Sequence, residues 1–511
     1  MNLANLLRVA EPVEIELAPI LERLEIIDSA GEIPRVATGI TQDSRRVKPG
    51  FVFAARSGAR ARGLDFIPDA SRRGAWLVVT ADALPEEIPI PAVRVRDFRR
   101  ALVALSHAIY RDPSRRLNLI GITGTNGKTS CTYILRSIFR AAGMRAGLVG
   151  TTGYDTGGTW IPADLTTPDI DRLCELLSDA VEAGCEWMVM EVSSHALALG
   201  RTSGLSFKGA GFTNLSPEHL DFHGTVEEYG AAKSRLFRSL FQDALAVVNI
   251  DDPYGRVMAE AARCRVLTYG VVNKEADLVA TILEQSLNGG RFLLQGDGEP
   301  FEVHTRLVGG FQVGNIALCA AMALEFGVSR AAVVRGVEAV DAIPGRMEPV
   351  DAGQPFTVLI DYSHTPDSLG KAIESTRDFS AGRLIVVFGC GGDRDRSKRP
   401  AMGRIAAETA DLVVVTSDNP RGEDPEAIIA EIVSGVPRER KGLVETVVDR
   451  RAAIKRALEI AQESDILLIS GKGHESYQET RGVRRPFDDR AVVREELAQL
   501  GWRSEANGGV R

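Results

Sequence analysis

LIGITGTNGKTSCTYIL, residues 119–135, is the segment on which the fold prediction depends. It opens with an apolar run typical of a buried strand, passes through a turn rich in glycine and threonine, and continues as a helix-like segment. Backbone N–H groups in such a turn, followed by a helix N-terminus, form a cradle for anions. The order of strand, glycine turn and helix therefore predicts a nucleotide-phosphate site in an α/β sheet.

Two side chains at the end of this turn suit phosphate chemistry. Lys128 would add a positive charge near the β- and γ-phosphates, and the Thr129 hydroxyl could bind Mg²⁺. A strict Walker A motif has glycine five residues before Gly127, where this chain has Ile122. The turn alone does not choose among a kinase, a ligase, a transporter and a switch. The predicted phosphate-binding residues are Gly124, Thr125, Asn126, Gly127, Lys128 and Thr129.

Composition narrows the class of protein. A length of 511 residues predicts two to four domains, and a net charge of −8 disfavours non-specific binding to nucleic acid. Six scattered cysteines without a C-x-x-C pair argue against a disulfide framework and a structural zinc site. The N-terminus lacks the apolar region of a signal peptide, and no segment has about 18 uninterrupted apolar residues. We expect a cytoplasmic protein that does not insert into a membrane.

Apolar runs divide the chain into three predicted domains. Residues 35–112 alternate short apolar runs with turns, as in a small α/β domain, and the polar segment 110–118 reads as a linker. Apolar runs at 187–192, 209–215 and 245–250 predict buried parallel strands. Four more, at 356–364, 383–393, 412–420 and 465–475, predict a second open sheet. We predict domains at 1–115, 116–343 and 344–511, with a frayed tail at 504–511.

Three further residues are candidates for the reaction centre. Glu191 ends an apolar run downstream of the phosphate loop, where a carboxylate suits Mg²⁺. His219 follows another run, in company with Asp221 and His223, although a packed histidine is the ordinary alternative. Lys233 lies in a predicted helix, where the residues alone predict a solvated surface lysine.

Ten segments follow one another in the order seen in the Mur ligases, and the chain resembles that family over roughly residues 35–490. The likeness is greatest to the members that add the third peptide residue of peptidoglycan. A single segment is only moderately specific, whereas ten in order are highly specific. The segments are TGTNGKTS, LTTPD, EVSSHAL, TNLSPEHLDFHG, AAKSRLF, IPGRMEPV, DYSHTPDSL, FGCGGDRDRSKRP, TSDNPRGEDP and GKGHE.

The resemblance implies a fold and a reaction. The fold is α/β, with a small N-terminal UDP-binding domain, a central parallel sheet of the P-loop ATPase type and a C-terminal Rossmann-like sheet. In the reaction, ATP phosphorylates the D-Glu γ-carboxylate of UDP-N-acetylmuramoyl-L-Ala-D-Glu, and an amine attacks the acyl phosphate. The implied cofactors are two Mg²⁺ ions and a CO₂-derived carbamate on a lysine, and the implied state is a monomer.

The resemblance also assigns roles to residues. Lys128, Glu191, His219 and Lys233 are the implied catalytic residues. Thr129, Glu191 and His219 match Mg²⁺ ligands, and Lys233 matches the carbamylated lysine, which overturns the prediction of a surface lysine. Asn315, Arg346, Asp361 and His364 match ATP contacts; Ser44, Arg45, Thr166, Thr167, Ser193 and Arg201 match contacts to the UDP-sugar peptide. Leu199 replaces a frequent family Gln and Gln312 a common family Asn, so a polar contact at position 199 is in doubt.

The DNPR segment, residues 418–421, marks family members that add meso-diaminopimelate, whereas lysine-adding relatives lack its Arg. Diaminopimelate resembles lysine with a second carboxylate, which a planar guanidinium binds in a bidentate manner. Glu475 would pair with the distal ammonium group. The implied pocket residues are Arg394, Asp418, Asn419, Pro420, Arg421, Gly471 and Glu475.

Other functions remain alternatives at this stage. The amine could be L-lysine or another diamino acid, which the presence of Arg421 argues against. Folylpolyglutamate synthase is a relative that the DSRRV segment (43–47) and DNPR fit poorly. A P-loop nucleotide switch would hydrolyse ATP without needing the other substrates.

Overall fold

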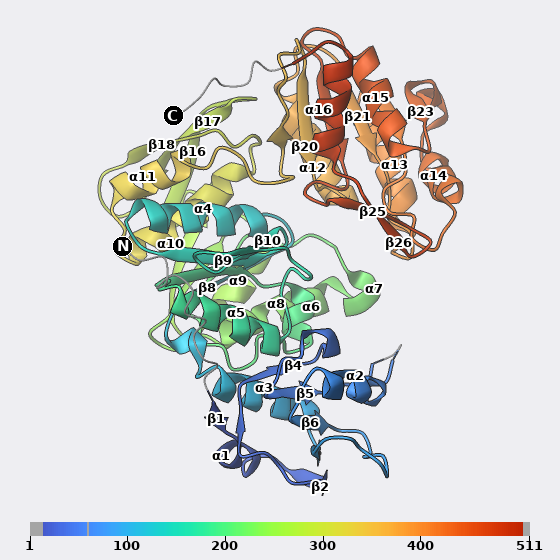
Figure 1. The fold of residues 1–511 in the computed structure, drawn as a ribbon. Helices are drawn as coiled ribbons and strands as arrows, with labels where there is room; N and C mark the ends of the chain where they lie inside the picture. Colours follow the sequence, from blue (N-terminus) through green and yellow to red (C-terminus); the bar gives the residue numbers. More distant parts are fainter. Residues whose placement is uncertain (1–13, 59–60, 504–511) are drawn as a thin grey trace, which may run out of the picture. The chain divides into compact units, whose positions relative to one another are not determined.

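The computed structural model describes residues 14–58 and 61–503, so the predicted tail 504–511 lies outside the described residues. The chain forms two compact units. The first runs to Ile120 and includes Arg145–Lys208, and the second contains Gly121–Met144 and the chain from Gly209 onward. The α/β class predicted from the sequence is confirmed in each unit (Figure 1). The three predicted domain limits stay a prediction.

The N-terminal part of the first unit is a five-stranded sheet in the order β2-β7-β6-β5-β4. Strands β4 to β7 are parallel, and β2 is an antiparallel edge strand. The predicted apolar runs form β5, β6 and β7, whose side chains join the core with Phe53 and Val78. The elements are β1 (Ile15–Glu16), α1 (Ala18–Leu21), β2 (Ile26–Ala30), β3 (Val36–Ala37), β4 (Gly39–Thr41), η2 (Ser44–Arg46), β5 (Phe51–Ala54), η3 (Gly63–Phe66), α2 (Ile67–Arg72), β6 (Leu77–Thr80), β7 (Ala92–Val95), α3 (Phe98–Ile109) and η4 (Pro113–Arg115).

The rest of the first unit carries β9 (Ala146–Gly150) with β12 (Trp187–Glu191) parallel to it and β10 (Gly153–Asp155) antiparallel to it. Strand β11 (Trp160–Ile161) pairs with β10. Helix α5 (Ile170–Glu182) packs on α3, and the short helix α6 (Ser194–Ala198) follows β12. The chain passes from the first unit to the second within β8 (Asn118–Thr123), just before the phosphate loop. It returns to the first unit at Arg145 and leaves it again after Lys208.

In the second unit, β13 (Gly209–Phe212) and β14 (Leu245–Asn249) are parallel, as predicted, and β15 (Arg265–Gly270), which the apolar runs did not predict, pairs parallel with β14. The next strands differ from the expected strand–helix repeat, because β16 (Leu278–Ser286), β17 (Gly289–Gln295) and β18 (Phe301–Thr305) form an antiparallel meander. The reason is local: Leu287 and Asn288 make a two-residue turn closed by Gly289. Gly289 has φ +114°, and a Cβ there would lie 1.8 Å from the Thr305 carbonyl oxygen, so only glycine fits.

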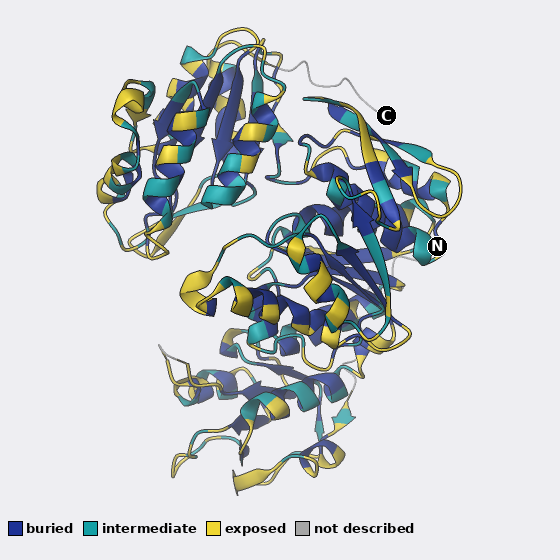
Figure 2. Cartoon of the chain, turned by 180° about the vertical axis from the view of Figure 1, so that it is seen from behind, coloured by how far each residue is buried: buried dark blue, intermediate teal, exposed yellow. Residues whose placement is uncertain are grey.

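The C-terminal sheet has the order β19-β20-β24-β21-β22-β23, and all of its strands except β19 are parallel. The four predicted runs form β20 (Thr357–Asp361), β21 (Leu384–Phe388), β22 (Leu412–Val415) and β24 (Ile466–Ser470). Alternate residues of β21 enter two separate cores. Val386 packs under α12 (Pro366–Arg377), α13 (Lys398–Thr409) and α14 (Pro425–Ser434), and Val387 packs under α15 (Arg450–Ile460) and α16 (Asp489–Gln499). Figure 2 shows the buried strands between helices whose outer faces are exposed. A sheet covered on both faces explains why its central strands β21 and β22 are apolar throughout.

The other elements of the second unit complete the two layers around its sheets. They are α4 (Lys128–Ala141), α7 (Leu220–His223), α8 (Val226–Arg238), α9 (Pro253–Ala261), α10 (Gln312–Glu325), α11 (Arg330–Glu338), β19 (Glu348–Pro349), α12 (Pro366–Arg377), α13 (Lys398–Thr409), α14 (Pro425–Ser434), η5 (Arg438–Leu443), β23 (Val444–Thr446), α15 (Arg450–Ile460), β25 (Tyr477–Thr480), β26 (Val483–Pro486) and α16 (Asp489–Gln499). Within residues 14–58 and 61–503, every helix is too short or too polar to cross a membrane.

A buried ion pair ties the loops of the C-terminal sheet together. Arg450 and Asp489 are both fully buried and join through two hydrogen bonds of 2.8 and 2.7 Å. Arg450 also donates to the carbonyl oxygens of Ser417, which follows β22, and Ser470, which ends β24. The pair therefore holds the starts of the two loops that contain DNPR and GKGHE.

We expect Arg450→Met to lower the free energy of unfolding of the C-terminal sheet by about 3 kcal/mol, because Asp489 keeps a buried charge without its partner. The measurement is the urea midpoint followed by circular dichroism. Arg456→Met is the matched control on the same helix, since its pair with Glu445 is exposed and worth about 1 kcal/mol at most. Equal midpoints for the two variants would contradict the prediction.

Candidate active site

The phosphate loop begins where β8 ends and stops at the first turn of α4. Thr125 N donates to the Asn214 carbonyl oxygen at 2.8 Å, and Asn126 N donates to Asn214 Oδ1 at 3.0 Å. Gly127 has φ +87°, and a Cβ there would lie 2.3 Å from Asn315 Oδ1. The loop can therefore make this turn only with glycine, and its held backbone leads directly into the α4 N-terminus, where anions are favoured.

Two lysines converge on this loop. Lys128 Nζ donates to the carbonyl oxygens of Gly124 and Thr125 at 2.9 and 2.6 Å, and Lys233 Nζ donates to the same Gly124 oxygen at 2.8 Å. Lys233 is only 1% exposed and lies 4.2 Å from the ring centroid of Tyr229. Burial, and then the charge of Lys128, lower the pKa of Lys233 well below its ordinary value. Lys233 on α8 is thus a buried amine beside the phosphate loop and not a surface lysine.

Glu218 is a site residue that the sequence reasoning missed. Its carboxylate lies 3.8 Å from His219 and 3.9 Å from His364. Burial pushes the pKa of Glu218 upward, but the charges of His219, His364, Lys128 and Lys233 outweigh burial and lower it. The signal was only its place in the segment TNLSPEHLDFHG, which drew attention to the neighbouring His219.

Contacts inside the second unit connect the phosphate loop with the loops of the C-terminal sheet. Arg346 Nη2 donates to Thr129 Oγ1 at 3.1 Å, and its guanidinium lies 4.8 Å from the Tyr362 ring centroid. The Tyr362 and His474 rings lie 4.9 Å apart, and His474 precedes Glu475. This series of contacts brings the predicted nucleotide and amino-acid residues toward one region.

The other residues predicted to contact ATP are Asn315, Asp361 and His364, and each has its own hydrogen-bonding environment. Asn315 is nearly buried beneath Gly127, and its amide donates to Gln312 Oε1 at 3.0 Å. Both carboxylate oxygens of Asp361 accept backbone hydrogen bonds, from Ser363 N at 2.8 Å and Met347 N at 2.9 Å. Burial and the charge of Lys398 lower the pKa of His364. Asp361 therefore shapes the segments that present Arg346 and His364.

Asn419 and Glu475 meet in the predicted amino-acid pocket, where Asn419 Nδ2 donates to Glu475 Oε2 at 2.8 Å. Burial and the nearby Asp418 raise the pKa of Glu475. Gly471 has φ +116° and lies against Asp418, so a Cβ there would be 3.0 Å from Asp418 Oδ2. The structure thus brings four of the predicted pocket residues together.

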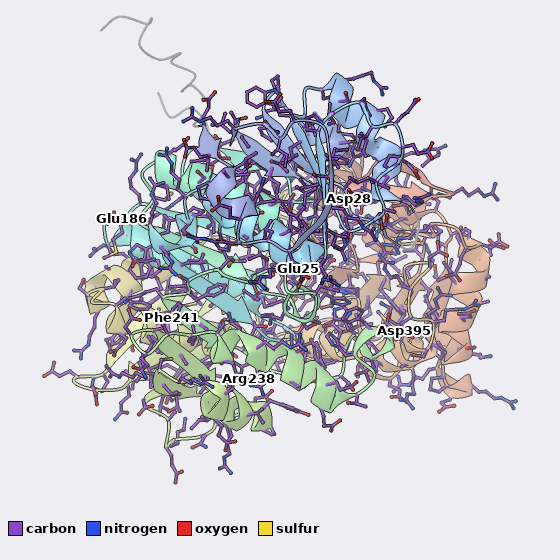
Figure 3. The ribbon with its side chains drawn as sticks, turned by 90° about the horizontal axis from the view of Figure 1, so that it is seen from below. Glu25, Asp28, Glu186, Arg238, Phe241 and Asp395 are labelled. Atoms are coloured by element: carbon purple, nitrogen blue, oxygen red, sulfur yellow. The ribbon has the colours of Figure 1, made fainter. Side chains whose placement is uncertain are left out.

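The loops that contain Arg394 and Arg421 follow neighbouring strands of the C-terminal sheet, β21 and β22. Arg421 Nη1 donates to the Gly392 carbonyl oxygen at 2.7 Å, close to Arg394 in sequence. Arg421 has the left-handed φ of +50°, and its backbone N–H donates to the Glu479 carbonyl oxygen at 2.9 Å. A non-glycine residue with this left-handed backbone conformation is strained, and such residues are common at binding sites. Asp395, labelled in Figure 3, follows Arg394 and accepts from Ser397 N at 2.9 Å.

In the first unit, the end of β12 gathers the residues predicted for the metal and the sugar peptide. Thr151 donates to both oxygens of Glu191, at 2.8 Å from its N–H and 3.0 Å from its hydroxyl. The Thr167 hydroxyl donates to the Glu191 carbonyl oxygen and accepts from Ser193 N, at 2.8 and 3.0 Å. The Thr166 and Thr151 hydroxyls lie 3.1 Å apart, and Arg201 Nη1 donates to the Thr167 carbonyl oxygen at 3.2 Å.

A cavity of about 330 Å³ lies in the first unit beyond the ends of β5 and β6. Leu199 is in its wall, so the position where the family often has Gln presents an apolar side chain to it. Arg56 and Arg99 also line the cavity, and both form ion pairs with Asp169. Sequence reasoning missed these two arginines because nothing distinguishes them from the other cations of the domain. The remaining members of the wall are Ala55, Ser57, Ala81, Asp82 and Phe98.

Ser44 and Arg45, predicted for the uridine side, lie in the 3₁₀ turn η2. Ser44 is nearly buried, whereas Arg45 is exposed and pairs with Asp43 at 2.7 Å. Side-chain and backbone hydrogen bonds from Arg45 lower the pKa of Asp43, against the effect of burial. The Asp43 carboxylate also caps this turn through the Arg45 N–H.

The donor set suits Mg²⁺ bound together with substrate. Among the described residues there is no cluster of three His, Cys, Asp or Glu side chains of the kind that binds a metal by itself. Mg²⁺ is commonly held by one or two carboxylates together with substrate phosphates and waters. Thr129 at the phosphate loop, and Glu191 with both oxygens already oriented by Thr151, are donors of this chemistry.

Three family models match the chain. The Mur ligase middle domain matches residues 122–323, the Mur ligase glutamate ligase domain matches 345–473, and the Mur ligase family catalytic domain matches 36–110. A UDP-N-acetylmuramoyl-L-alanyl-D-glutamate--2,6-diaminopimelate ligase of Solibacter usitatus is 43% identical over 506 residues, covering 98% of this chain and 99% of that protein. The protein of the same name from Aquifex aeolicus is 41% identical over 463 residues, covering 91% and 94%.

Solved structures agree with these matches. The structure of a UDP-N-acetylmuramoyl-L-alanyl-D-glutamate--2,6-diaminopimelate ligase is similar with a TM-score of 0.65 and 34% identity, covering 96% of this chain and all of that one. MurF from Acinetobacter baumannii matches with a TM-score of 0.69 at 20% identity, covering 90% and 96%, and therefore supports the fold alone.

Proposed function

Since this chain belongs to the Mur ligase family, we propose that it is the ATP-dependent ligase that joins meso-diaminopimelate to UDP-N-acetylmuramoyl-L-Ala-D-Glu in peptidoglycan synthesis. The observation that carries the proposal is the series of contacts from Thr129 through Arg346 and Tyr362 to His474, beside Glu475. It connects a phosphate loop to a pocket with the side chains that a diamino diacid needs. We further propose that the enzyme acts in the cytoplasm as a monomer.

The proposed reaction has two steps. An oxygen of the D-Glu γ-carboxylate attacks the γ-phosphorus of ATP, and ADP leaves. The neutral amine of diaminopimelate then attacks the acyl carbon of the resulting acyl phosphate, loses a proton, and the C–O bond to phosphate breaks. A free carboxylate is a poor electrophile, whereas an acyl phosphate carries a good leaving group, so the ATP is spent on activation. The protein contributes mainly positioning and electrostatic stabilisation.

The phosphate loop and its cations hold the nucleotide in this proposal. Lys128 and the α4 N-terminus bind the β- and γ-phosphates, and Lys128 exchanges its bonds to Gly124 and Thr125 for phosphate oxygens. Arg346 stands beside Thr129 and faces the same phosphates. Asn315 supports the loop from below Gly127, and His364 lies near Glu218 at the edge of this site.

Lys233 carries a carbamate in the working enzyme. Carbamylation requires an uncharged amine that attacks CO₂, forming an N–C bond with loss of one proton, and the lowered pKa of Lys233 favours that uncharged form. The product is an anion beside Lys128, so the modified side chain is attracted to the Lys128 ammonium. Burial next to the phosphate loop thus prepares this lysine for the modification.

Mg²⁺ would be held by Thr129, Glu191, His219 and the carbamate of Lys233, together with substrate oxygens. When bound, it neutralises phosphate charge as the phosphoryl group is transferred. Part of this site is already ordered by the protein alone, since Thr151 orients both carboxylate oxygens of Glu191.

The first unit binds the UDP-sugar peptide. Three arginines, Arg56, Arg99 and Arg201, lie around the single carboxylate of Asp169, so the group has excess positive charge suited to a diphosphate. Ser44 and Arg45 contact the uridine side, and Thr166, Thr167, Ser193 and Arg201 contact the sugar and peptide. Leu199 supplies an apolar contact at the cavity wall where other family members use an amide.

Phosphate release tests the function directly. We expect purified protein to release phosphate only when ATP, UDP-N-acetylmuramoyl-L-Ala-D-Glu and meso-diaminopimelate are all present. With an equal mixture of diaminopimelate and L-lysine, the mass of the nucleotide-sugar product should be that of the diaminopimelate adduct. Phosphate release from ATP alone would favour a nucleotide switch, and a lysine adduct would contradict the assigned substrate.

A further inference from the structure

Lys472, between the two glycines of GKGHE, is a buried cation at the centre of the amino-acid pocket. Its side chain is fully buried, and its ammonium contacts three pocket side chains. Nζ donates to Asn419 Oδ1 at 3.2 Å and to Glu475 Oε2 at 3.3 Å, and it lies 3.6 Å from Asp418 Oδ1. A fully buried lysine is rare unless paired, so these contacts account for its retention there.

The three partners form a polar cluster that Lys472 organises. Asn419 Oδ1 also accepts from Glu479 N at 2.9 Å, which fixes the orientation of the amide so that Nδ2 faces Glu475. Asp418 Oδ1 is buried and has no hydrogen-bond partner in the part of the chain that the structure describes. Two carboxylates and one ammonium leave a net charge of −1, which matches a single added cation.

We propose that Lys472 is a positioning residue that keeps Glu475 ionised and aimed, so that the pocket accepts the distal ammonium of the diamino acid. The inference deepens the proposed function and rests on it for the identity of the ligand. Lys472 does not touch the reacting atoms in this account. It acts through Glu475 and Asn419, which it contacts directly.

The neighbouring charges explain why the ionisation of Glu475 depends on Lys472. Burial and Asp418 raise the pKa of Glu475, and the opposing effects are the charge of Lys472 and hydrogen bonds from Asn419 and Lys472. Without the ammonium, the two carboxylates would face each other with less compensation, so the pKa of Glu475 would rise further and its protonated form would become more populated. A protonated Glu475 cannot form an ion pair with the substrate. The more distant ionisable groups around Glu475 are Arg450, Arg484, Tyr362 and Tyr477.

The test uses Lys472→Met with two amine substrates that differ by one group. Meso-diaminopimelate carries the distal ammonium, and 2-aminopimelate keeps the distal carboxylate but lacks that ammonium. At pH 7 we expect Lys472→Met to raise the KM for diaminopimelate at least tenfold, with kcat changed less than threefold. The KM for 2-aminopimelate should change less than threefold. As the pH rises toward 9, the diaminopimelate defect should shrink relative to the wild type, because Glu475 ionises.

Matched variants separate this role from general damage. Lys455→Met makes the same substitution at an exposed position of α15 and should leave both KM values unchanged. In a Glu475→Gln background, adding Lys472→Met should raise the KM for diaminopimelate less than twofold further, since the carboxylate it serves is already gone. An equal rise for both substrates, or a defect independent of pH, would overturn the proposal.

Direct titration tests the proposal without turnover. In the free protein, ¹³C-carboxyl NMR with Glu475 assigned by Glu475→Gln should show its midpoint at higher pH in Lys472→Met than in wild type. An unchanged midpoint would overturn the role assigned to Lys472. If Lys472→Met does not fold, Lys472→Arg takes its place, and equal defects for both amines in a folded Lys472→Arg would also overturn that role. If the wild type forms no product from diaminopimelate, the proposed function fails, whereas the titration still decides the role of Lys472.

Discussion

Replacing Lys233 with alanine is expected to lower kcat by about 10⁴-fold, equivalent to about 5.5 kcal/mol of transition-state stabilisation. The reason is the position of this amine. It is buried, shares the Gly124 carbonyl oxygen with Lys128, and has a pKa lowered well below its ordinary value by burial, which favours the uncharged amine that reacts with CO₂. Alanine removes the buried amine that would carry the carbamate. The measurement is steady-state phosphate release with all three substrates present.

Chemical rescue distinguishes the carbamate from a general effect on folding. Short carboxylates such as formate or acetate should restore part of the activity of Lys233→Ala by supplying an anion at the vacated position. Nucleotide affinity should change little, because Lys128 and the loop backbone remain. Lys455→Ala, at an exposed helical position, is the matched control and should keep full activity. Full turnover in Lys233→Ala would contradict the carbamate role.

The second large effect is expected for Arg421→Ala, with kcat/KM for diaminopimelate lowered by about 10³-fold, or about 4 kcal/mol. The guanidinium is oriented in advance by its bond to the Gly392 carbonyl oxygen, and its backbone is held by Glu479. Without it, the distal carboxylate enters a partly buried site without a partner. The KM for ATP should stay within twofold, since the phosphate loop is unchanged.

Two comparisons sharpen the test of Arg421. Arg421→Lys keeps the charge but lacks the planar fork, so we expect it to remain impaired by at least 30-fold in kcat/KM for diaminopimelate. Arg404→Ala on α13 removes an exposed arginine and should behave as wild type. An unchanged kcat/KM in Arg421→Ala would remove this residue from the pocket.

Much of the architecture could be predicted from local patterns. The runs that became β5 and β21 are apolar throughout, and those of β20 and β24 are apolar except at strand ends, because buried parallel strands leave no polar side. The phosphate loop was also predictable, because its glycines and Lys128 lie within a few consecutive residues that form one turn. The meander of β16 to β18 was missed because its strands mix exposed and buried positions without a regular period.

The ten ordered segments also identified the family and its reaction, because each segment contributes residues to that reaction and all ten can be recognised in the sequence. Two site residues could not be identified from that order, since Glu218 looks like a loop acid and Lys472 is one residue of a glycine-rich turn. Lys233 was assigned only through the family segment AAKSRLF, because the residues alone predict a surface lysine in a helix. Each owes its chemistry to burial and to charges from distant segments: Glu218 to His364, and Lys472 to Asn419. Local periodicity is set by neighbours along the backbone, whereas desolvation and charge pairing arise only when folding brings remote segments within a few ångströms.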